Sequence, residues 1–230
     1  MAYFGLRKPF IASYNKETGT YSGGFQCGKA IKVSVTPNYV EGSLYADDEQ
    51  DEYEKVFQNA NVSLNTNTLP IKAANTMYGH EIDEESREVI YKSTDEPNYV
   101  GTGFVVSQTV SGIKSYVATI ITCAKFTESA EEYTTKGESI TYVTPTQEGL
   151  AIPDKNSRWK DQKTFDTAEE AVRYIKAYLN MAEYVEVTPA GTENPSEEGW
   201  YERSGAEGAY VYTLTADVTV DSEKTYYRMV

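Results

Sequence analysis

Two long runs of β-forming residues, separated by only two positions, constrain the fold more than any other part of the sequence. Residues 99–110 and 113–125 are both rich in Val, Ile, Thr and Tyr, and Ser111 and Gly112 stand between them. β-Branched and aromatic residues favour strands, and a two-residue connection that contains Gly favours a hairpin turn. The sequence therefore predicts a long β-hairpin within a mainly β (α+β) protein.

Shorter strand signals surround this hairpin. Residues 31–36 alternate apolar and polar side chains until Pro37, which is expected to close the strand, and residues 56–65 alternate less regularly. Residues 1–25 contain five Gly and Pro residues, so we expect an arm or hairpin that becomes ordered only against a neighbouring molecule. Three further strands are expected, at residues 88–92, 126–133 and 140–143, with Lys136 and Gly137 as a turn between the last two.

Two segments carry helix signals. A short helix over residues 71–78 follows a proline and ends at Gly79, where helices favour glycine. A longer helix is expected over residues 165–180, because Thr167 and Glu170 have the spacing of a capping box. Its apolar residues recur at helical spacing, so we expect that face to pack on the sheet.

Acidic residues outnumber basic ones by 35 to 21, which gives a formal net charge of −14. Such a chain repels nucleic acid phosphates unless a basic patch is segregated on one face. The densest acidic segment is residues 38–55, where seven carboxylates precede the first base, Lys55. Like charges at this density predict a solvated, extended loop. It imitates the start of a calcium loop, but Glu52 and Gln58 replace the required Gly and Glu, so no dedicated metal site is expected.

The sequence offers little to catalysis. Cys27 and Cys123 are too few and too far apart for a thiolate metal site, and Cys123 lies in an apolar run that predicts a buried thiol. His80 is the only histidine, so any histidine-dependent mechanism would rest on one ring. Gly101 and Gly103 start a dinucleotide fingerprint that lacks its third glycine. We therefore expect no enzymatic activity and no cofactor, and the absence of a signal peptide predicts synthesis in the cytosol.

Composition changes after residue 182. Residues 183–230 hold ten acids and three bases, half of the net charge, and short strand signals recur around residues 184–187, 199–202, 209–214 and 225–228. We expect a small acidic β appendage. Its aromatic residues either make its core or offer a platform for glycans. The residues of the glycan-platform interpretation are Trp200, Tyr201, Tyr210 and Tyr212, with Tyr226 and Tyr227.

Several motifs in sequence resemble the major tail protein family of long, non-contractile-tailed bacteriophages (siphoviruses) of Gram-positive bacteria. The first is KAIKVSVTPNYVEGSLYADDEQDEYEKVFQNANVSLNTNTLP, followed by AANTMYGHE. NYVGTGFVV, the hairpin beginning SGIKSYV, a segment around Trp159 and the helix TAEEAVRYIKAYL then follow in the family's order. The resemblance covers about residues 1–182.

The resemblance implies a tail-tube fold of two packed antiparallel sheets, a β-sandwich, with one flanking helix. It implies a structural virion protein that self-assembles into hexameric rings, stacked as a tail tube through which the genome passes. Its partners would be copies of itself and the tape measure, distal tail and tail terminator proteins; DNA would pass through the lumen without specific binding. It would be made in the host cytoplasm and reside in the virion tail, away from membranes, without catalytic residues.

The domain interpretation places the tail-tube domain at residues 1–182, including the N-terminal arm and the acidic loop 38–55. Residues 183–230 would lie on the tube exterior. The acidic loop would contact either the next ring, where it needs Lys or Arg opposite, or the lumen, where negative walls repel DNA. The residues of this hypothesis are Tyr45, Asp47, Asp48, Glu49, Asp51 and Glu52. The alternatives are a cell-surface or carbohydrate-binding β module and, third, a sugar hydrolase.

Overall fold

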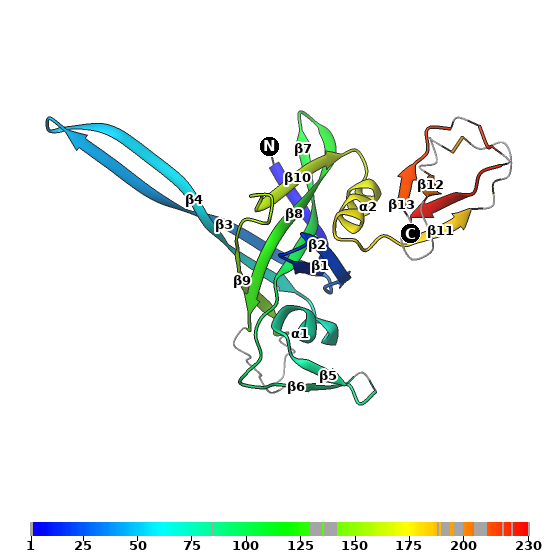
Figure 1. Cartoon of the computed structure of the whole chain (residues 1–230), viewed down its shortest axis with the longest axis horizontal. Helices are drawn as coiled ribbons and strands as arrows, with labels where there is room; N and C mark the ends of the chain where they lie inside the picture. The colour runs from blue at the N-terminus through cyan, green and yellow to red at the C-terminus, as the bar shows by residue number, and fades with distance from the viewer. Residues whose placement is uncertain are drawn as a thin grey trace. The chain divides into compact units, whose positions relative to one another are not determined.

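The computed structural model describes residues 2–83, 85–128, 135, 142–187, 189, 194–195, 200–204, 211–217, 219–221 and 223–229. The chain divides into two compact units, Met1–Met181 and Ala182–Val230, each with its own sheet. The fold is mainly β, as predicted (Figure 1). Neither helix within the described residues has the length and apolar character needed to cross a membrane.

The first unit is built on one eight-stranded sheet whose neighbours all pair antiparallel. The strand order is β2-β1-β7-β8-β9-β4-β3, and β10 also pairs with β8. The strands are β1 (Ala2–Asn15), β2 (Thr20–Gln26), β3 (Ala30–Ala46), β4 (Glu49–Thr66), β7 (Val100–Val110), β8 (Ile113–Thr127), β9 (Thr146–Ala151) and β10 (Lys160–Phe165).

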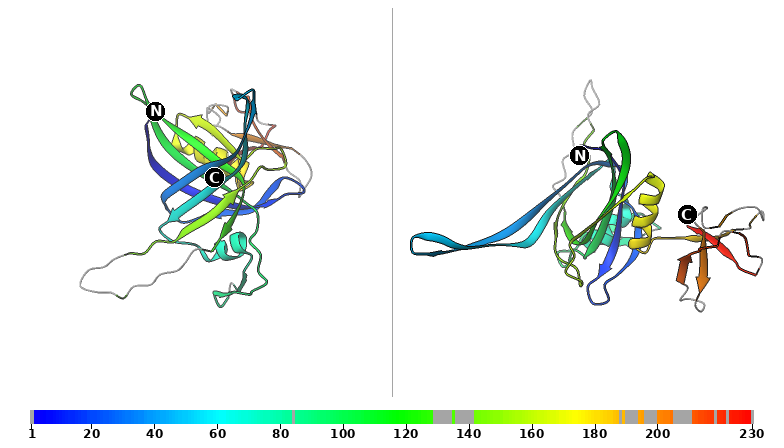
Figure 2. Two further views of the ribbon diagram at one scale, coloured as in Figure 1. Left: turned by 90° about the vertical axis from the view of Figure 1, so that its left-hand side faces the viewer. Right: turned by 90° about the horizontal axis from the view of Figure 1, so that it is seen from above.

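Strand β8 is the point at which the sheet branches and folds over. Its residues 116–121 pair with β10, whereas residues 124–127 pair with β9, which also pairs with β4. Pairing is therefore continuous from β2 to β3, and the expected two separate sheets are one sheet that curls over itself (Figure 2). A core that includes Val62, Leu64, Phe104 and Phe126 fills the space between its two layers.

The central hairpin is confirmed, with Ser111 and Gly112 as its turn at φ values of 50° and 82°. Of the arm or hairpin expected at residues 1–25, the structure has the hairpin, in which β1 and β2 pair antiparallel. β1 lies between β2 and β7, and its residues Phe10 and Ile11 are almost completely buried. Residues 2–15 become ordered by pairing within their own chain, because the strand tolerates its glycine and proline through shifts in register.

Helix α1 (Ile71–Tyr78) has the predicted bounds and ends at Gly79, whose φ of 78° is in the left-handed region. A side chain at Gly79 would also meet the Glu96 carbonyl oxygen at 2.4 Å, so both backbone conformation and space favour glycine. The helix buries Ala73 and Met77 in the core between the layers.

Helix α2 (Ala168–Tyr178) begins at the predicted capping box, in which Thr167 and Glu170 each bond the other's backbone N–H. Its apolar face covers β1, β7 and β8 on the outer side of the sheet, as expected from the spacing of its apolar residues. The helix approaches β7 closely at Gly103, where a Cβ atom would lie 2.4 Å from Ile175 Cγ2.

Short polar strands account for most of what the sequence did not indicate. β5 (Glu81–Asp83) and β6 (Glu88–Ile90) form a two-stranded sheet, of which only β6 was expected. Neither β9 nor β10 was expected. The strands expected at residues 126–133 and 140–143 lie mainly outside the described residues; β8 ends at Thr127, and Tyr142 and Val143 are in no strand.

The second unit has a four-stranded antiparallel sheet of order β11-β14-β12-β13. Its strands are β11 (Tyr184–Val187), β12 (Tyr201–Ser204), β13 (Val211–Leu214) and β14 (Tyr226–Met229), near the positions predicted from the turn signals. Trp200 and Tyr226 are buried, and their ring centroids lie 5.5 Å apart. The aromatic residues thus supply the core of a unit that has little other apolar side-chain volume.

Candidate assembly surface

The expected acidic loop is the outer half of a long β-hairpin. β3 and β4 pair from Ala30↔Thr66 to Ala46↔Glu49, whereas β9 pairs with β4 only over residues 60–65. Beyond this point no strand among the described residues covers either edge, and the hairpin extends away from the sheet (Figure 1; Figure 2, right). At about 3.3 Å per residue, ten residues of each strand extend roughly 30 Å beyond the sheet. The segment at residues 38–55 is extended and solvated as predicted, but it consists of paired strands, so the prediction of a loop was wrong.

A two-residue turn at Asp47 and Asp48 makes the hairpin possible. Their φ values are 51° and 67°, as in a type I′ turn, and Asp adopts this left-handed region more readily than most residues. Pro37 does not close β3, because β3 is an edge strand and the missing N–H is not needed for pairing. The sequence therefore favours a tight hairpin despite the local density of negative charge.

Apolar side chains are exposed on both faces of the outer hairpin. On one face Val40 and Val56 are opposite each other, 54% and 60% exposed, and on the other face Tyr53 is 52% exposed. Leu44 and Tyr45 continue these exposed positions to the turn. A two-stranded hairpin is at best marginally stable alone in water, and exposed apolar surface of this kind marks a contact site.

The charges of the hairpin differ between its base and its tip. Near the base, Lys55 pairs with Glu41 and its Nζ lies 5.1 Å from the Tyr39 ring centroid. The hydrogen bond from Lys55 lowers the pKa of Glu41. The acidic tip, residues 45–52, contains five carboxylates, and none of them pairs with a cation within the described residues.

The base of the hairpin is held by aromatic packing. The Phe57 ring stacks on Trp159 with centroids 4.7 Å apart and planes inclined by 14°, and Tyr39 packs edge-on against Phe57 at 6.0 Å. Trp159 comes from the segment just before β10, so the hairpin is anchored to the body of the unit. This packing fixes the direction in which the outer hairpin leaves the body, although no other described strand covers the hairpin.

All six residues of the predicted contact lie together in the acidic tip. Tyr45 is 66% exposed and pairs with Gln50, while Asp47 and Asp48 form the turn between the strands. Prediction from sequence missed the exposed apolar partners Leu44, Tyr53 and Val56. Their alternation along residues 39–57 is the signal that could have revealed both the strands and the exposed faces.

The glycan platform is not supported by the second unit. Trp200 is only 3% exposed, so its ring cannot stack on a sugar. Tyr201 is half-buried, and Tyr212 packs edge-on against Tyr227 at 5.2 Å. Tyr210 lies outside the described residues. The core interpretation of Trp200, Tyr226 and Tyr227 is the one confirmed, since all three are buried.

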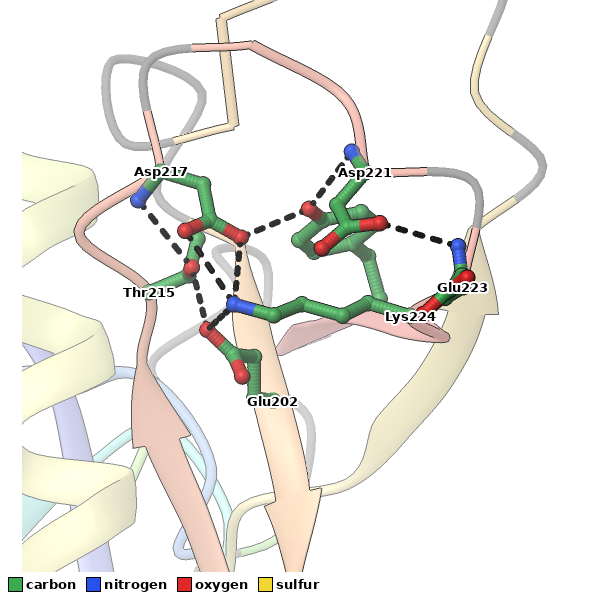
Figure 3. Close-up of polar contacts among 7 residues, drawn as sticks. Glu202, Thr215, Asp217, Asp221, Glu223 and Lys224 are labelled. Atoms are coloured by element: carbon green, nitrogen blue, oxygen red, sulfur yellow. Dashed lines mark hydrogen bonds and ion pairs between the residues drawn. The ribbon is translucent and has the colours of Figure 1, made fainter.

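Lys224 is the centre of a polar network in the second unit (Figure 3). Its Nζ lies 2.9 and 3.2 Å from the Asp217 carboxylate oxygens and 3.2 Å from Glu202 Oε1. The hydroxyl of Tyr226 donates to Asp217 at 2.7 Å, and that of Thr215 donates to Glu202 at 2.6 Å. These bonds lower the pKa of Asp217 and raise that of Lys224. The ion pair between Lys224 and Glu202 joins β12 to the loop before β14.

The groups considered for catalysis are engaged or buried. His80 Nδ1 lies 2.6 Å from Asp95 Oδ2, and its Nε2 contacts Glu128, so neither ring nitrogen is left to activate Cys123. Burial raises the pKa of Cys27 to about 12 and that of Cys123 to about 11, which keeps both thiols protonated. Within the described residues no group of three potential ligands could hold a metal ion.

A surface hollow of about 430 Å³ lies beside the end of α2 and is lined by Tyr21, Arg158, Tyr178 and three smaller residues. Arg158 is paired with Asp154 and Asp161, and the Tyr178 hydroxyl donates to Asp161 at 2.5 Å. The guanidinium of Arg158 and the hydroxyl of Tyr178, which line the hollow, are therefore already bonded within the chain.

No protein-family model matches the chain, and no curated protein sequence matches it. Among the described residues, the outer hairpin combines uncovered edges, exposed apolar faces and unpaired carboxylates, which are the properties of a contact surface.

Proposed function

We propose that this chain is a structural protein of a bacteriophage virion that polymerises as stacked hexameric rings into the tail tube, forming the channel for genome passage. Its motifs resemble the major tail protein family, and the outer β3–β4 hairpin provides independent support. The proposal includes no enzymatic activity and no cofactor.

The observation that carries the proposal is the bare hairpin. Val40, Leu44 and Val56 are each more than half exposed on a ribbon that has no covering layer among the described residues. Exposing such a ribbon is unfavourable in water, and covering it with another copy removes the cost. A protein that acts as a monomer has no need of this extension, whereas a subunit of a polymer does.

Two uncovered sheet edges are further support. Among the described residues, β3 pairs with β4 alone, and residues 2–7 of β1 pair with β7 alone. Uncovered edges present free N–H and C=O groups to another strand. Copies can therefore associate laterally through their backbones as well as through the hairpin. The tape measure, distal tail and tail terminator proteins are the further partners in this proposal.

Electron microscopy of the purified full-length chain over a range of concentrations tests the proposal. We expect rings and tubes of uniform diameter, and glycan arrays should retain no protein. Particles that stay monomeric at every concentration and bind glycans would instead favour the carbohydrate-binding alternative.

The proposal assigns residues 183–230 to the exterior of the tube. They form a compact unit with an aromatic core and the Lys224 network, and they carry half of the net charge. Deleting Glu183–Val230 should leave tubes of normal diameter and spacing with a thinner outer profile in electron micrographs. A deletion variant that is folded by circular dichroism yet forms no rings would assign the unit to assembly.

A further inference from the structure

A strip of aromatic rings and cations crosses four strands of the first unit. Phe4, Ser107, Tyr116 and Phe165 occupy one register row, because Phe4 pairs with Ser107, Ser107 with Tyr116, and Tyr116 with Phe165. Opposed residues of antiparallel strands share a face of the sheet. The row thus places three aromatic side chains, from β1, β8 and β10, on the face whose neighbouring part is covered by α2.

Three cations lie over these rings. Lys114 Nζ is 5.6 Å from the Phe4 centroid and 5.4 Å from that of Tyr116, and Arg7 Cζ is 5.8 Å from the Tyr116 centroid. Lys163 Nζ is 5.3 Å from the Phe165 centroid. We call these residues the basic aromatic strip: Phe4, Arg7, Lys114, Tyr116, Lys163 and Phe165.

None of the strip's three cations forms an ion pair with a described residue. Arg7, Lys114 and Lys163 are all exposed, and Phe4 is 48% exposed. The same chain carries the complementary surface, since the acidic tip joins unpaired carboxylates to the exposed Tyr45. The chain as a whole is strongly acidic, whereas the strip gathers three cations beside exposed aromatic rings, which makes it complementary in charge to that tip.

The two surfaces cannot meet within one copy. The hairpin extends away from the body on the side opposite α2, whereas the strip lies on the face that α2 covers (Figure 2, right). We propose that the acidic tip of one copy docks on the basic aromatic strip of a second copy. The contact deepens the proposed function and rests on it. Because its two halves are different surfaces, it is heterologous and generates rings or open polymers.

Charge reversal tests the contact with three variants of the full chain. The strip variant is Lys114→Glu with Lys163→Glu, which leaves Arg7 against two carboxylates. The tip variant is Glu49→Lys with Asp51→Lys and Glu52→Lys, which leaves only Asp47 and Asp48 against three cations, so the tip becomes basic. The control is Lys72→Glu with Arg87→Glu, which has the same net charge as the strip variant. Lys72 also lies over a ring, 5.6 Å from the Phe25 centroid, but it belongs to α1.

Each of the first two variants alone places like charges in the contact, so we expect its critical concentration for assembly to rise about fivefold or more. An equimolar mixture pairs the basic tip with the acidic strip, and the acidic tip with the basic strip. It should therefore assemble within about twofold of the wild-type concentration. The control should assemble like the wild type.

A mixture that assembles no better than its components, or a control impaired as strongly as the strip variant, would overturn the docking. Crosslinking gives a second measurement, since both native cysteines are buried. Glu49→Cys chains mixed with Lys114→Cys chains should give mixed dimers with a short bismaleimide, and absence of these dimers in assembled material contradicts the contact.

The outcomes separate this contact from the proposed function. If the wild type forms tubes and every variant assembles equally well, the docking fails and tube formation stands. If the wild type never assembles, both fail. If the strip variant instead loses affinity for a single-stranded oligonucleotide while its assembly is unchanged, the strip is a nucleic acid surface and the docking is wrong.

Discussion

The hairpins β7–β8 and β3–β4 have nearly the same turn but opposite surroundings. Ser111 and Gly112 have φ values of 50° and 82°, and Asp47 and Asp48 have values of 51° and 67°. In both hairpins the strands run antiparallel for more than ten residues. Away from its turn the first is covered on both faces, whereas the outer half of the second is bare.

The two hairpins have similar backbones, so the difference in their functions must come from their side chains. β8 contains seven buried apolar residues between Val117 and Phe126, which fixes it in the core. β3 and β4 place apolar residues among carboxylates, so their outer halves gain stability only from another molecule. One hairpin supports the monomer, and the other is available for contact between copies.

The largest expected difference between the two hairpins is in the free energy of unfolding that is lost when one aliphatic side chain is truncated to Ala. Ile121 in β8 is fully buried, and Ile121→Ala should lower the free energy of unfolding by about 2–5 kcal/mol. Val56 in β4 is 60% exposed, and Val56→Ala should change it by less than about 0.5 kcal/mol while weakening assembly. Urea denaturation and light scattering measure the two effects. Equal losses of stability would remove the distinction.

A glycine in each hairpin gives a second test. A Cβ at Gly103 in β7 would lie 2.4 Å from Ile175 Cγ2, so Gly103→Ala should displace α2 and lower the free energy of unfolding by about 1–3 kcal/mol. Gly42 in β3 has nothing within 4 Å, so Gly42→Ala should be neutral within about 0.5 kcal/mol. Thermal unfolding compares them, and a costly Gly42→Ala would mean that the outer hairpin is packed in solution.

Neutralising the acidic tip should affect assembly alone. Asp47→Asn, Asp48→Asn and Asp51→Asn together keep residues that tolerate the left-handed turn, so the free energy of unfolding should change by less than about 0.5 kcal/mol. Tube formation should be impaired, as measured by tube length and by infectivity of the assembled phage. A control replaces three exposed acids elsewhere by Gln: Glu17, Glu85 and Glu88. Normal tubes in the triple Asn variant would exclude the tip from contact.

The smallest expected effect is on pH dependence. Because the hydrogen bond from Lys55 lowers the pKa of Glu41, the stabilisation is present above the unfolded pKa and is lost as pH falls through the lowered folded value. Residues 99–127 contain no acid, so β7–β8 has no such dependence of its own. Amide hydrogen exchange at pH 3 to 6 should show the outer hairpin losing protection first. Glu41→Gln should reduce this pH dependence, and an unchanged profile would contradict it.

The elements predicted correctly from sequence are those with local signals. The Ser111–Gly112 turn, the capping box at Thr167 and the glycine after α1 each depend on residues within a few positions. β9 and β10 have polar sequences, and only pairing with β4 and β8, at partners 21 to 91 residues distant, makes them strands. Local pattern cannot indicate such pairing.

The acidic tip shows the same limit at the candidate site. Its residues were identified together because they are contiguous, but the density of carboxylates was interpreted as evidence for a loop. Cross-strand pairs such as Val40↔Val56 and Glu41↔Lys55 outweigh the repulsion. The strip of Phe4, Tyr116 and Phe165 could not be found from sequence, because it exists only in the register of four strands.

The order of the strands also bears on the time at which each part of the chain becomes structured during synthesis. β1 needs β7, about 90 residues later, and the curled sheet cannot close before β8 is complete. β3 and β4 pair locally, so this marginally stable hairpin can begin to form as soon as residue 66 has emerged, before β9 pairs with it. About 60 further residues reach Thr127, which at ~5–20 residues per second takes on the order of 3–12 s. During this interval a nascent chain displays its adhesive ribbon before it has a folded body, and chains on one messenger would be exposed to premature association.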